Sequence, residues 1–145
     1  MINYVTRGYR KVFLIKTNVF RGGCMRKKIL IIEDNAENME LFCTVLKCGG
    51  YEPLQARNGM EGVKVAMEAK PHLILMDIQM PVMNGYDAIK ILKSEASTRH
   101  IPSIALTAES LRDAGESFMK HGFDDYIPKP IKLTEFIRTI DKHLV

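Results

Sequence analysis

Short apolar runs alternate with segments of helical periodicity from Lys28 to the end of the chain. Strands of a parallel sheet that is covered on both faces read as near-continuous apolar runs bounded by turn residues. The pattern predicts five strands, at Lys28–Ile32, Glu52–Ala56, His72–Met76, Pro102–Leu106 and Asp124–Ile127. Because the second run is weaker and more polar than the others, we expect it at an edge of the sheet.

Five amphipathic helices are expected between and after these strands. The first runs from about Ala36 to Lys47, the second follows a turn signal at Asn58-Gly59 and stops at Pro71, the third covers Gly85–Lys93, the fourth ends before Gly122, and the last carries a stripe from Leu133 to Leu144. The residues expected to face inward from the first four are Met39, Phe42, Val45 and Leu46; Met60, Val63 and Ala66; Ala88, Ile89 and Leu92; and Leu111, Ala114, Phe118 and Met119. Gly115 costs about 1 kcal/mol relative to alanine, so we expect the fourth helix to be the loosest.

The strict alternation of strands and helices predicts an α/β fold. Right-handed crossovers between such units form a doubly wound, five-stranded parallel sheet with helices on both faces, a three-layer αβα architecture. We expect the flavodoxin-like strand order 2-1-3-4-5. Functional sites in this fold lie beyond the carboxyl ends of the strands, here between the first and third strands.

Five chemically active residues follow the predicted strands at that edge. They are Glu33, Asp34, Asp77, Thr107 and Lys129, which come from four different strands. Taken singly, each has an ordinary structural interpretation, such as a helix cap, a strand-end cap or a solvated surface charge. Their joint occurrence at the ends of the first, third, fourth and fifth strands indicates a functional site.

Three neighbouring carboxylates imply a cation. At about 5 Å each pair repels by roughly 3 kcal/mol at an effective dielectric near 20, so the acids will not gather unless their charge is compensated. Mg²⁺ prefers oxygen ligands and keeps part of its hydration shell. Asp34 and Asp77 suit direct ligation, the longer Glu33 suits a contact through water, and the backbone carbonyl of Gln79 could supply another oxygen.

A carboxylate beside Mg²⁺ and a lysine can attack phosphorus. The metal and the ammonium neutralise the equatorial oxygens of the transferring phosphoryl group. In this interpretation Asp77 becomes an acyl phosphate, and Lys129 faces the transferred group.

Four spaced motifs resemble the receiver domain of two-component response regulators, the CheY-like family. They are Ile31-Ile32-Glu33-Asp34-Asn35, Leu75-Met76-Asp77-Ile78-Gln79-Met80-Pro81 with Asn84-Gly85, Ala105-Leu106-Thr107-Ala108 and Tyr126-Ile127-Pro128-Lys129-Pro130. Within the family, the Glu-Asp-Asn segment with Asn38 and the Met-Asp-Ile-Gln loop are most similar to the DivK-type single-domain regulators. Receivers of hybrid kinases share much of this pattern.

The resemblance implies a role for each residue. Asp77 is expected to be the phosphoacceptor, Glu33 and Asp34 to hold Mg²⁺ with Mn²⁺ as a substitute, and Lys129 to pair with the phosphate. Thr107 and Tyr126 match the two switch positions of the family. The Lys129–Pro130 bond is expected to be cis. The protein would then be a phosphoacceptor in signalling rather than an enzyme.

Charge divides the chain into two parts, a basic extension at residues 1–24 and a receiver domain at residues 25–145. The extension contains no acid and carries Arg7, Arg10, Lys11, Lys16 and Arg21, whereas the remainder has 16 basic and 17 acidic residues. The domain therefore has no nucleic-acid footprint, and we expect no direct DNA binding. The extension is expected to be non-native or disordered, although a basic arm for an acidic partner or lipid is the alternative.

Cysteine content and hydropathy bear on location. Cys24, Cys43 and Cys48 are an odd number without metal-ligand spacing, which favours reduced thiols and a cytoplasmic protein. No apolar run approaches the ~18 residues that a membrane span requires, so we expect no membrane insertion.

We expect no output domain after Val145, and we therefore expect the protein to act through protein contacts. The phosphodonor would be a sensor histidine kinase or a histidine phosphotransfer protein. A downstream target would bind the fourth helix, fifth strand and fifth helix, and the resemblance to DivK suggests cell-cycle, division or polarity control. Two alternatives remain open: a phosphorylation-independent adaptor with a receiver fold, and a flavodoxin-like nucleotide-binding enzyme, which the acidic loop after the first strand disfavours.

Overall fold

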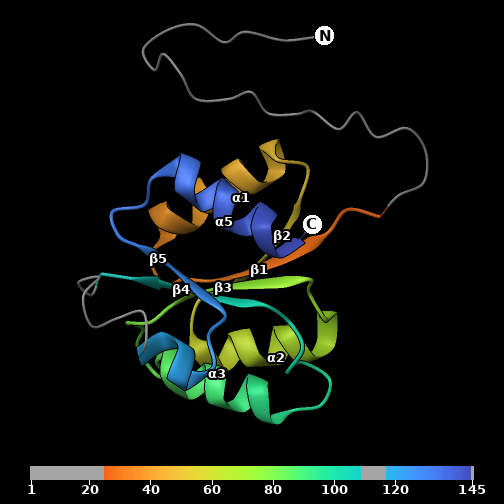
Figure 1. The fold of residues 1–145 in the computed structure, drawn as a ribbon, viewed down its shortest axis with the longest axis vertical. Helices are drawn as coiled ribbons and strands as arrows, with labels where there is room; N and C mark the ends of the chain where they lie inside the picture. Colours follow the sequence, from red (N-terminus) through yellow and green to blue (C-terminus); the bar gives the residue numbers. More distant parts are fainter. Residues whose placement is uncertain (1–24, 109–116, 145) are drawn as a thin grey trace, which may run out of the picture.

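One parallel five-stranded sheet forms the centre of the molecule (Figure 1). The computed structural model describes residues 25–108 and 117–144. The strands are β1 Lys28–Ile32, β2 Glu52–Ala56, β3 Leu73–Asp77, β4 Ser103–Thr107 and β5 Asp125–Pro128. Their order is β2-β1-β3-β4-β5, as predicted, and Glu52–Ala56 is an edge strand.

Helices cover both faces of the sheet. They are α1 Ala36–Cys48, α2 Gly59–Ala69, α3 Gly85–Ser94 and α5 Leu133–Leu144. In Figure 1, α1 and α5 lie on one face, and α2 and α3 lie on the other. Residues 117–121 are helical as well and end the predicted fourth helix. Leu111, Ala114 and Gly115, on which that prediction also relied, lie outside the described residues.

The core consists of two apolar layers separated by the sheet. On one face Phe42 of α1 stacks on Phe136 of α5, with ring centroids 5.3 Å apart. On the other face Ala66, Ile89 and Phe118 pack against the sheet. Every residue of β3 and β4 is buried, which explains the continuous apolar runs from which these strands were predicted.

Three strands, β3, β4 and β5, end one residue later than predicted, and in the first two the shift concerns the site. β3 includes Asp77 and β4 includes Thr107. Parallel pairing continues to these residues, because Asp77 pairs with Leu106 and Thr107 pairs with Pro128. Both polar side chains therefore start from the rigid end of the sheet rather than from a loop.

The prediction that Met60 and Met119 face inward was wrong. Each side chain is 59% exposed. The buried stripe of α2 instead consists of small residues, Gly59, Gly62 and Ala66. A Cβ atom at position 62 would lie 2.3 Å from Ile32 Cδ1, so the helix approaches the sheet too closely for a larger side chain. This close approach turns Met60 outward.

Asn58 and Gly59, which were predicted to form a turn, begin α2 instead. Asn58 is the N-cap of α2, because its side-chain oxygen accepts a hydrogen bond from the Glu61 backbone N–H. Gly59 is already the first helical residue. Among the helices of residues 25–108 and 117–144, none combines the length and the apolar character that crossing a membrane would need.

Candidate functional site

The carboxyl ends of β1, β3, β4 and β5 bring the predicted site residues to one edge of the sheet. Glu33 and Asp34 follow β1, Asp77 ends β3, Thr107 ends β4, and Lys129 follows β5. One carboxylate oxygen from each of Glu33, Asp34 and Asp77 lies within 4.8 Å of the others. The fold therefore brings Asp77 to two acids that lie more than 40 positions earlier in the sequence.

Hydrogen bonds in the β1–α1 turn orient the first acid. The Asn35 backbone N–H donates to Glu33 Oε1 at 3.2 Å. The Asn35 side chain in turn caps α1 by accepting from the Asn38 backbone N–H at 2.8 Å. Asn35 thus links the start of the helix to the placement of Glu33.

The loop after β3 holds Asp77 from its own backbone. The Gln79 N–H donates to Asp77 Oδ1 at 3.0 Å, and the Gly85 N–H closes the loop on the Ile78 carbonyl at 2.9 Å. A Cβ atom at position 85 would lie 2.8 Å from the Asp77 carbonyl oxygen, so this approach requires glycine. Sequence reasoning assigned Gln79 a role through its carbonyl and missed the contact that its N–H makes.

Lys129 connects two of the acids. Its Nζ lies 2.9 Å from Asp77 Oδ2 and 3.5 Å from Glu33 Oε2. The Lys129 backbone N–H donates to the Thr107 carbonyl at 2.6 Å, and the Lys129–Pro130 bond is cis. Burial by itself would lower the pKa of Lys129, but the hydrogen bond and negative charge of Asp77, with the charge of Glu33, raise it. The lysine therefore stays a cation.

Glu33 is the most confined acid of the site. Its side chain is 1% exposed, and its Oε2 accepts no hydrogen bond from the described chain. Lys129 Nζ lies 3.5 Å from this oxygen, so the two groups form an ion pair but no hydrogen bond. The pKa of Glu33 is raised to about 7. Burial is the largest cause, the negative charge of the Asp77 carboxylate also raises it, and the positive charge of Lys129 lowers it. A buried oxygen of this kind, beside two further carboxylates, suits a hard cation.

Thr107 and Tyr126 occupy neighbouring strands. Thr107 is buried at the end of β4, and Tyr126 of β5 is half-buried and pairs with Ala105 in register. The Tyr126 ring lies 5.7 Å from the ring of Phe118. The structure thus places both residues in the β4–β5 part of the sheet, with Thr107 closer to the carboxyl edge.

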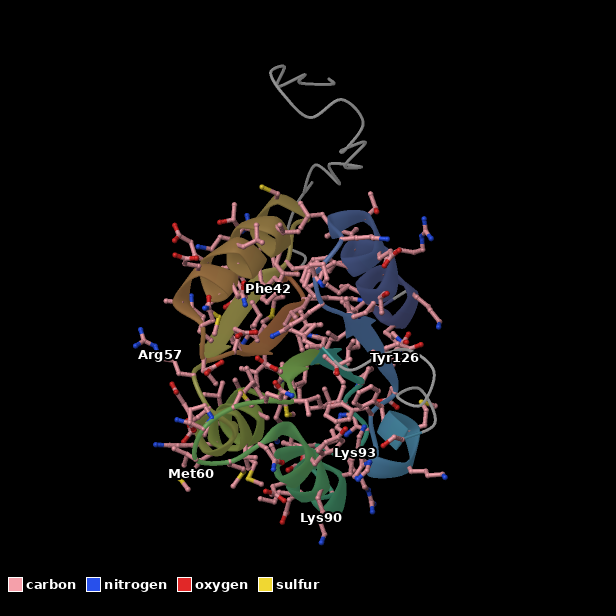
Figure 2. All side chains as sticks on the ribbon, turned by 90° about the vertical axis from the view of Figure 1, so that its left-hand side faces the viewer. Phe42, Arg57, Met60, Lys90, Lys93 and Tyr126 are labelled. Atoms are coloured by element: carbon pink, nitrogen blue, oxygen red, sulfur yellow. The ribbon has the colours of Figure 1, made fainter. Side chains whose placement is uncertain are left out.

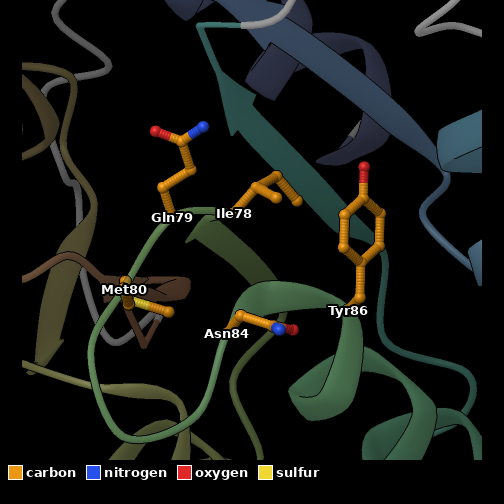
Figure 3. A pocket seen from close by; sticks show the side chains of 5 residues that line it. All are labelled: Ile78, Gln79, Met80, Asn84 and Tyr86. Atoms are coloured by element: carbon orange, nitrogen blue, oxygen red, sulfur yellow. The ribbon is translucent and has the colours of Figure 1, made fainter.

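A shallow hollow of about 380 Å³ lies beside the loop of residues 78–84, which connects Asp77 at the end of β3 to α3. Its walls are Ile78, Gln79, Met80, Asn84 and Tyr86, and Figure 3 shows these side chains around the bend of the loop. The Asn84 side chain caps α3 by accepting from the Asp87 backbone N–H. The hollow is open to solvent, and one of its walls is Ile78, which directly follows Asp77 in the chain.

Together these features place three acids that could hold a cation around one restrained carboxylate, that of Asp77. Asp77 is 5% exposed, contacts a lysine and lies among two other acids. Such a carboxylate can attack an electrophile whose negative charge the lysine and a bound cation neutralise. Phosphorus in a phosphoryl group is an electrophile of this kind.

Comparison with known families supports this interpretation. The family described as response regulator receiver domain matches residues 29–141. The polar-differentiation response regulator DivK of Brucella anthropi is 43% identical over 120 residues, which cover 83% of this chain and 98% of that protein. DivK of Brucella ovis is 42% identical over the same shares of the two chains.

Solved structures agree. One similar structure is the receiver domain of the sensor histidine kinase PA1611 from Pseudomonas aeruginosa, which has a magnesium ion coordinated in its active-site cleft. It aligns with a TM-score of 0.75 and 32% identity, and the alignment covers 81% of this chain and 97% of that chain. A co-crystal structure of the Saccharomyces cerevisiae histidine phosphotransfer protein Ypd1 with the receiver domain of its downstream response regulator Ssk1 gives a TM-score of 0.74 and 28% identity, with 81% and 88% covered. This chain belongs to the response regulator receiver family of two-component signalling.

Proposed function

We propose that Asp77 accepts a phosphoryl group from the phosphohistidine of a sensor kinase or of a histidine phosphotransfer protein. The observation that carries the proposal is the position of Asp77: it is 5% exposed, its Oδ2 lies 2.9 Å from Lys129 Nζ, and two more carboxylates lie within 4.8 Å. The solved Ypd1–Ssk1 complex, in which a receiver domain is bound to a histidine phosphotransfer protein, supports this class of donor.

The transfer moves one phosphoryl group and no net electrons. A carboxylate oxygen of Asp77 forms the new P–O bond while the P–N bond to the donor imidazole breaks. The electron pair of that bond stays on the imidazole nitrogen, which takes up a proton from solvent. Lys129 remains protonated throughout and pairs with the phosphoryl oxygens, so the negative charge stays balanced.

The residues present suit Mg²⁺. Asp34 and Asp77 would bind it directly, Glu33 would do so through water, and the Gln79 carbonyl would add an oxygen. The buried Oε2 of Glu33, which lacks a hydrogen bond from the described residues, supports a cation at this position. When bound, Mg²⁺, or Mn²⁺ in its place, supplies positive charge that stabilises the equatorial oxygens in the transition state.

Phosphorylation would change protein contacts through the β4–β5 region. It adds roughly −1.5 to −2 units of charge, which would attract the Thr107 hydroxyl and free space for Tyr126. A downstream target would bind the changed surface of the fourth helix, β5 and α5. Control of cell cycle or polarity is part of the same proposal, and the DivK relatives support it. A cytoplasmic location is also part of it, and the free Cys43 and Cys48 support reduced thiols. Residues 1–24, for which we expected a non-native or disordered extension, lie outside the described residues.

Intact-mass analysis after treatment with acetyl phosphate tests this proposal. We expect one phosphate adduct that requires Mg²⁺ and is lost in Asp77→Asn. An adduct that persists in Asp77→Asn would move the acceptor to another residue. Absence of any adduct in the wild type would favour a phosphorylation-independent adaptor, and a nucleotide that copurifies would favour a nucleotide-binding enzyme.

A further inference from the structure

Two exposed apolar residues lie on two segments that contact each other, the start of α2 and the loop between β3 and α3. Met60 is 59% exposed and Val82 is 79% exposed. Met60 follows Gly59, whose Cβ position would lie 2.6 Å from the Met83 carbonyl oxygen, so the start of α2 touches the loop that carries Val82. We call Met60 and Val82, with the half-buried Met80 and Met83, the Met60–Val82 surface.

This surface is close to Asp77. The Gly85 N–H is hydrogen-bonded to the Ile78 carbonyl, and a Cβ at Gly85 would lie 2.8 Å from the Asp77 carbonyl oxygen. Val82 is three residues from Gly85, a span of at most about 11 Å. Val82 therefore lies within about 15 Å of Asp77. In Figure 2, which faces the carboxyl edge of the sheet, Met60 projects outward from α2 on the rim of this edge.

The backbone of Val82 is strained, although its side chain packs little. Its φ is +71°, a region that β-branched residues rarely adopt. Such conformations are unfavourable for a β-branched residue and concentrate at binding and catalytic sites. A glycine or asparagine would suit this bend at lower cost. Because Val82 is 79% exposed, burial of its side chain within this molecule does not offset the backbone strain. The exposed side chain is therefore available for contact with another molecule.

We propose that the Met60–Val82 surface docks an apolar face of the protein that carries the donor phosphohistidine. The inference rests on the proposed phosphotransfer to Asp77. A donor must bring its imidazole over Asp77, and a standard interface of about 800 Å² per partner has a radius of roughly 16 Å. An interface centred on Asp77 thus reaches Val82. The flexible thioether side chains of Met60, Met80 and Met83 can adapt to a large apolar residue of the partner.

The position of the surface favours the donor over other occupants. A downstream target is expected on β5 and α5, whereas Met60 and Val82 belong to α2 and the β3–α3 loop. The α2 and α3 helices cover the face of the sheet opposite α5 (Figure 1). A partner on the Met60–Val82 surface adjoins the opening to Asp77 and leaves the α5 face free.

Comparison of two kinds of phosphodonor tests this inference. Met60→Lys, Val82→Lys and the double variant are assayed with acetyl phosphate, which needs no docking. They are also assayed with purified, autophosphorylated histidine kinases of the source organism and with its histidine phosphotransfer proteins after these kinases have phosphorylated them. Met119→Lys is the matched control. Met119 is also a methionine with 59% exposure, but it belongs to the helical residues 117–121, outside the Met60–Val82 surface. We expect the double variant to lose about tenfold in kcat/KM with the protein donor that is fastest for the wild type. The rate with acetyl phosphate and the behaviour of the control should not change.

Other outcomes would overturn the inference. Unchanged transfer from every protein donor, an equal loss in Met119→Lys, or wild-type protein that accepts phosphate from acetyl phosphate but from no histidine donor would each do so. Loss of self-association or of target binding in the double variant, with normal transfer, would assign the surface to another occupant. Failure of the wild type with acetyl phosphate would instead defeat the proposed function itself, so the two failures are distinguishable.

Discussion

Lys129 places its ammonium nitrogen 2.9 Å from the Asp77 carboxylate, across 52 positions of sequence. The same nitrogen lies 3.5 Å from Glu33, so one cation offsets two acids in a confined space. We expect Lys129→Met to slow phosphorylation of Asp77 by acetyl phosphate about a hundredfold, because a preoriented donor to the phosphoryl oxygens is lost. Phosphoprotein formation against time measures the effect. Lys132→Met, whose side chain is 73% exposed, is the control and should react normally.

Mg²⁺ should stabilise the folded protein through its acidic site. Binding to the native state alone raises the unfolding temperature as the metal concentration increases. We expect Asp34→Asn to weaken Mg²⁺ binding at least about tenfold, because it removes one of the three carboxylates that lie within 4.8 Å. Calorimetric titration and thermal unfolding with and without Mg²⁺ measure both effects. Equal stabilisation of variant and wild type would place the metal elsewhere.

Gly62 permits the close packing of α2 on β1. A Cβ there would lie 2.3 Å from Ile32 Cδ1, so we expect Gly62→Ala to destabilise the fold by about 2 kcal/mol despite the better helix propensity of alanine. Urea unfolding measures this loss. Ile32→Val removes the nearest clashing atom, Cδ1, and leaves Cγ1 at 2.7 Å, so the double variant should lose about 1 kcal/mol less than the summed losses of the single variants. Ile31→Val, on the opposite face, should show no such coupling.

Val82→Asn should make the protein more stable. Asparagine tolerates the left-handed conformation that Val82 adopts at φ +71°, so we expect a gain of about 1 kcal/mol in the free energy of unfolding. Val82→Thr keeps the β-branch and should give no gain. If the apolar side chain contacts the donor, Val82→Asn gains stability while it loses transfer from the protein donor. Reduced stability of Val82→Asn would contradict the strain argument.

Asp125 should make stability depend on acid pH. Its carboxylate contacts His143 Nε2 at 2.9 Å and Lys142 Nζ at 3.3 Å. Burial would raise the pKa of Asp125, but the hydrogen bonds from His143, the Tyr126 N–H and Lys142 outweigh it and lower the pKa below its ordinary value of 3.8. A lowered pKa stabilises the fold above the ordinary value, and the contribution is lost as the pH falls through the folded-state pKa.

We therefore expect Asp125→Asn to be about 1 kcal/mol less stable than the wild type at pH 7 and to approach it below pH 3.8. Urea unfolding at several pH values measures the difference. Glu68→Gln on the exposed side of α2 is the control and should have little effect at any pH. A difference that stays constant down to the acid limit would exclude the carboxylate as its source.

The strand order and the gathering of the acids followed from local patterns. Short apolar runs, such as residues 73–76, alternate with segments of helical periodicity, and a parallel sheet is the compact arrangement for that order. Since the carboxyl ends of parallel strands meet at one edge, the residues after those strands, Glu33 and Lys129 among them, had to lie near each other.

Only the tertiary structure decided which apolar residues are buried and how each acid is restrained. Hydrophobicity assigned Met60 to the core, but Gly62 approaches Ile32 so closely that the small face of α2 turns inward. Likewise, the raised pKa of Glu33 depends on its burial and on Asp77, which is remote in sequence. Residue type and spacing determine which groups meet, whereas interatomic contact determines which of them are buried, charged or exposed to a partner.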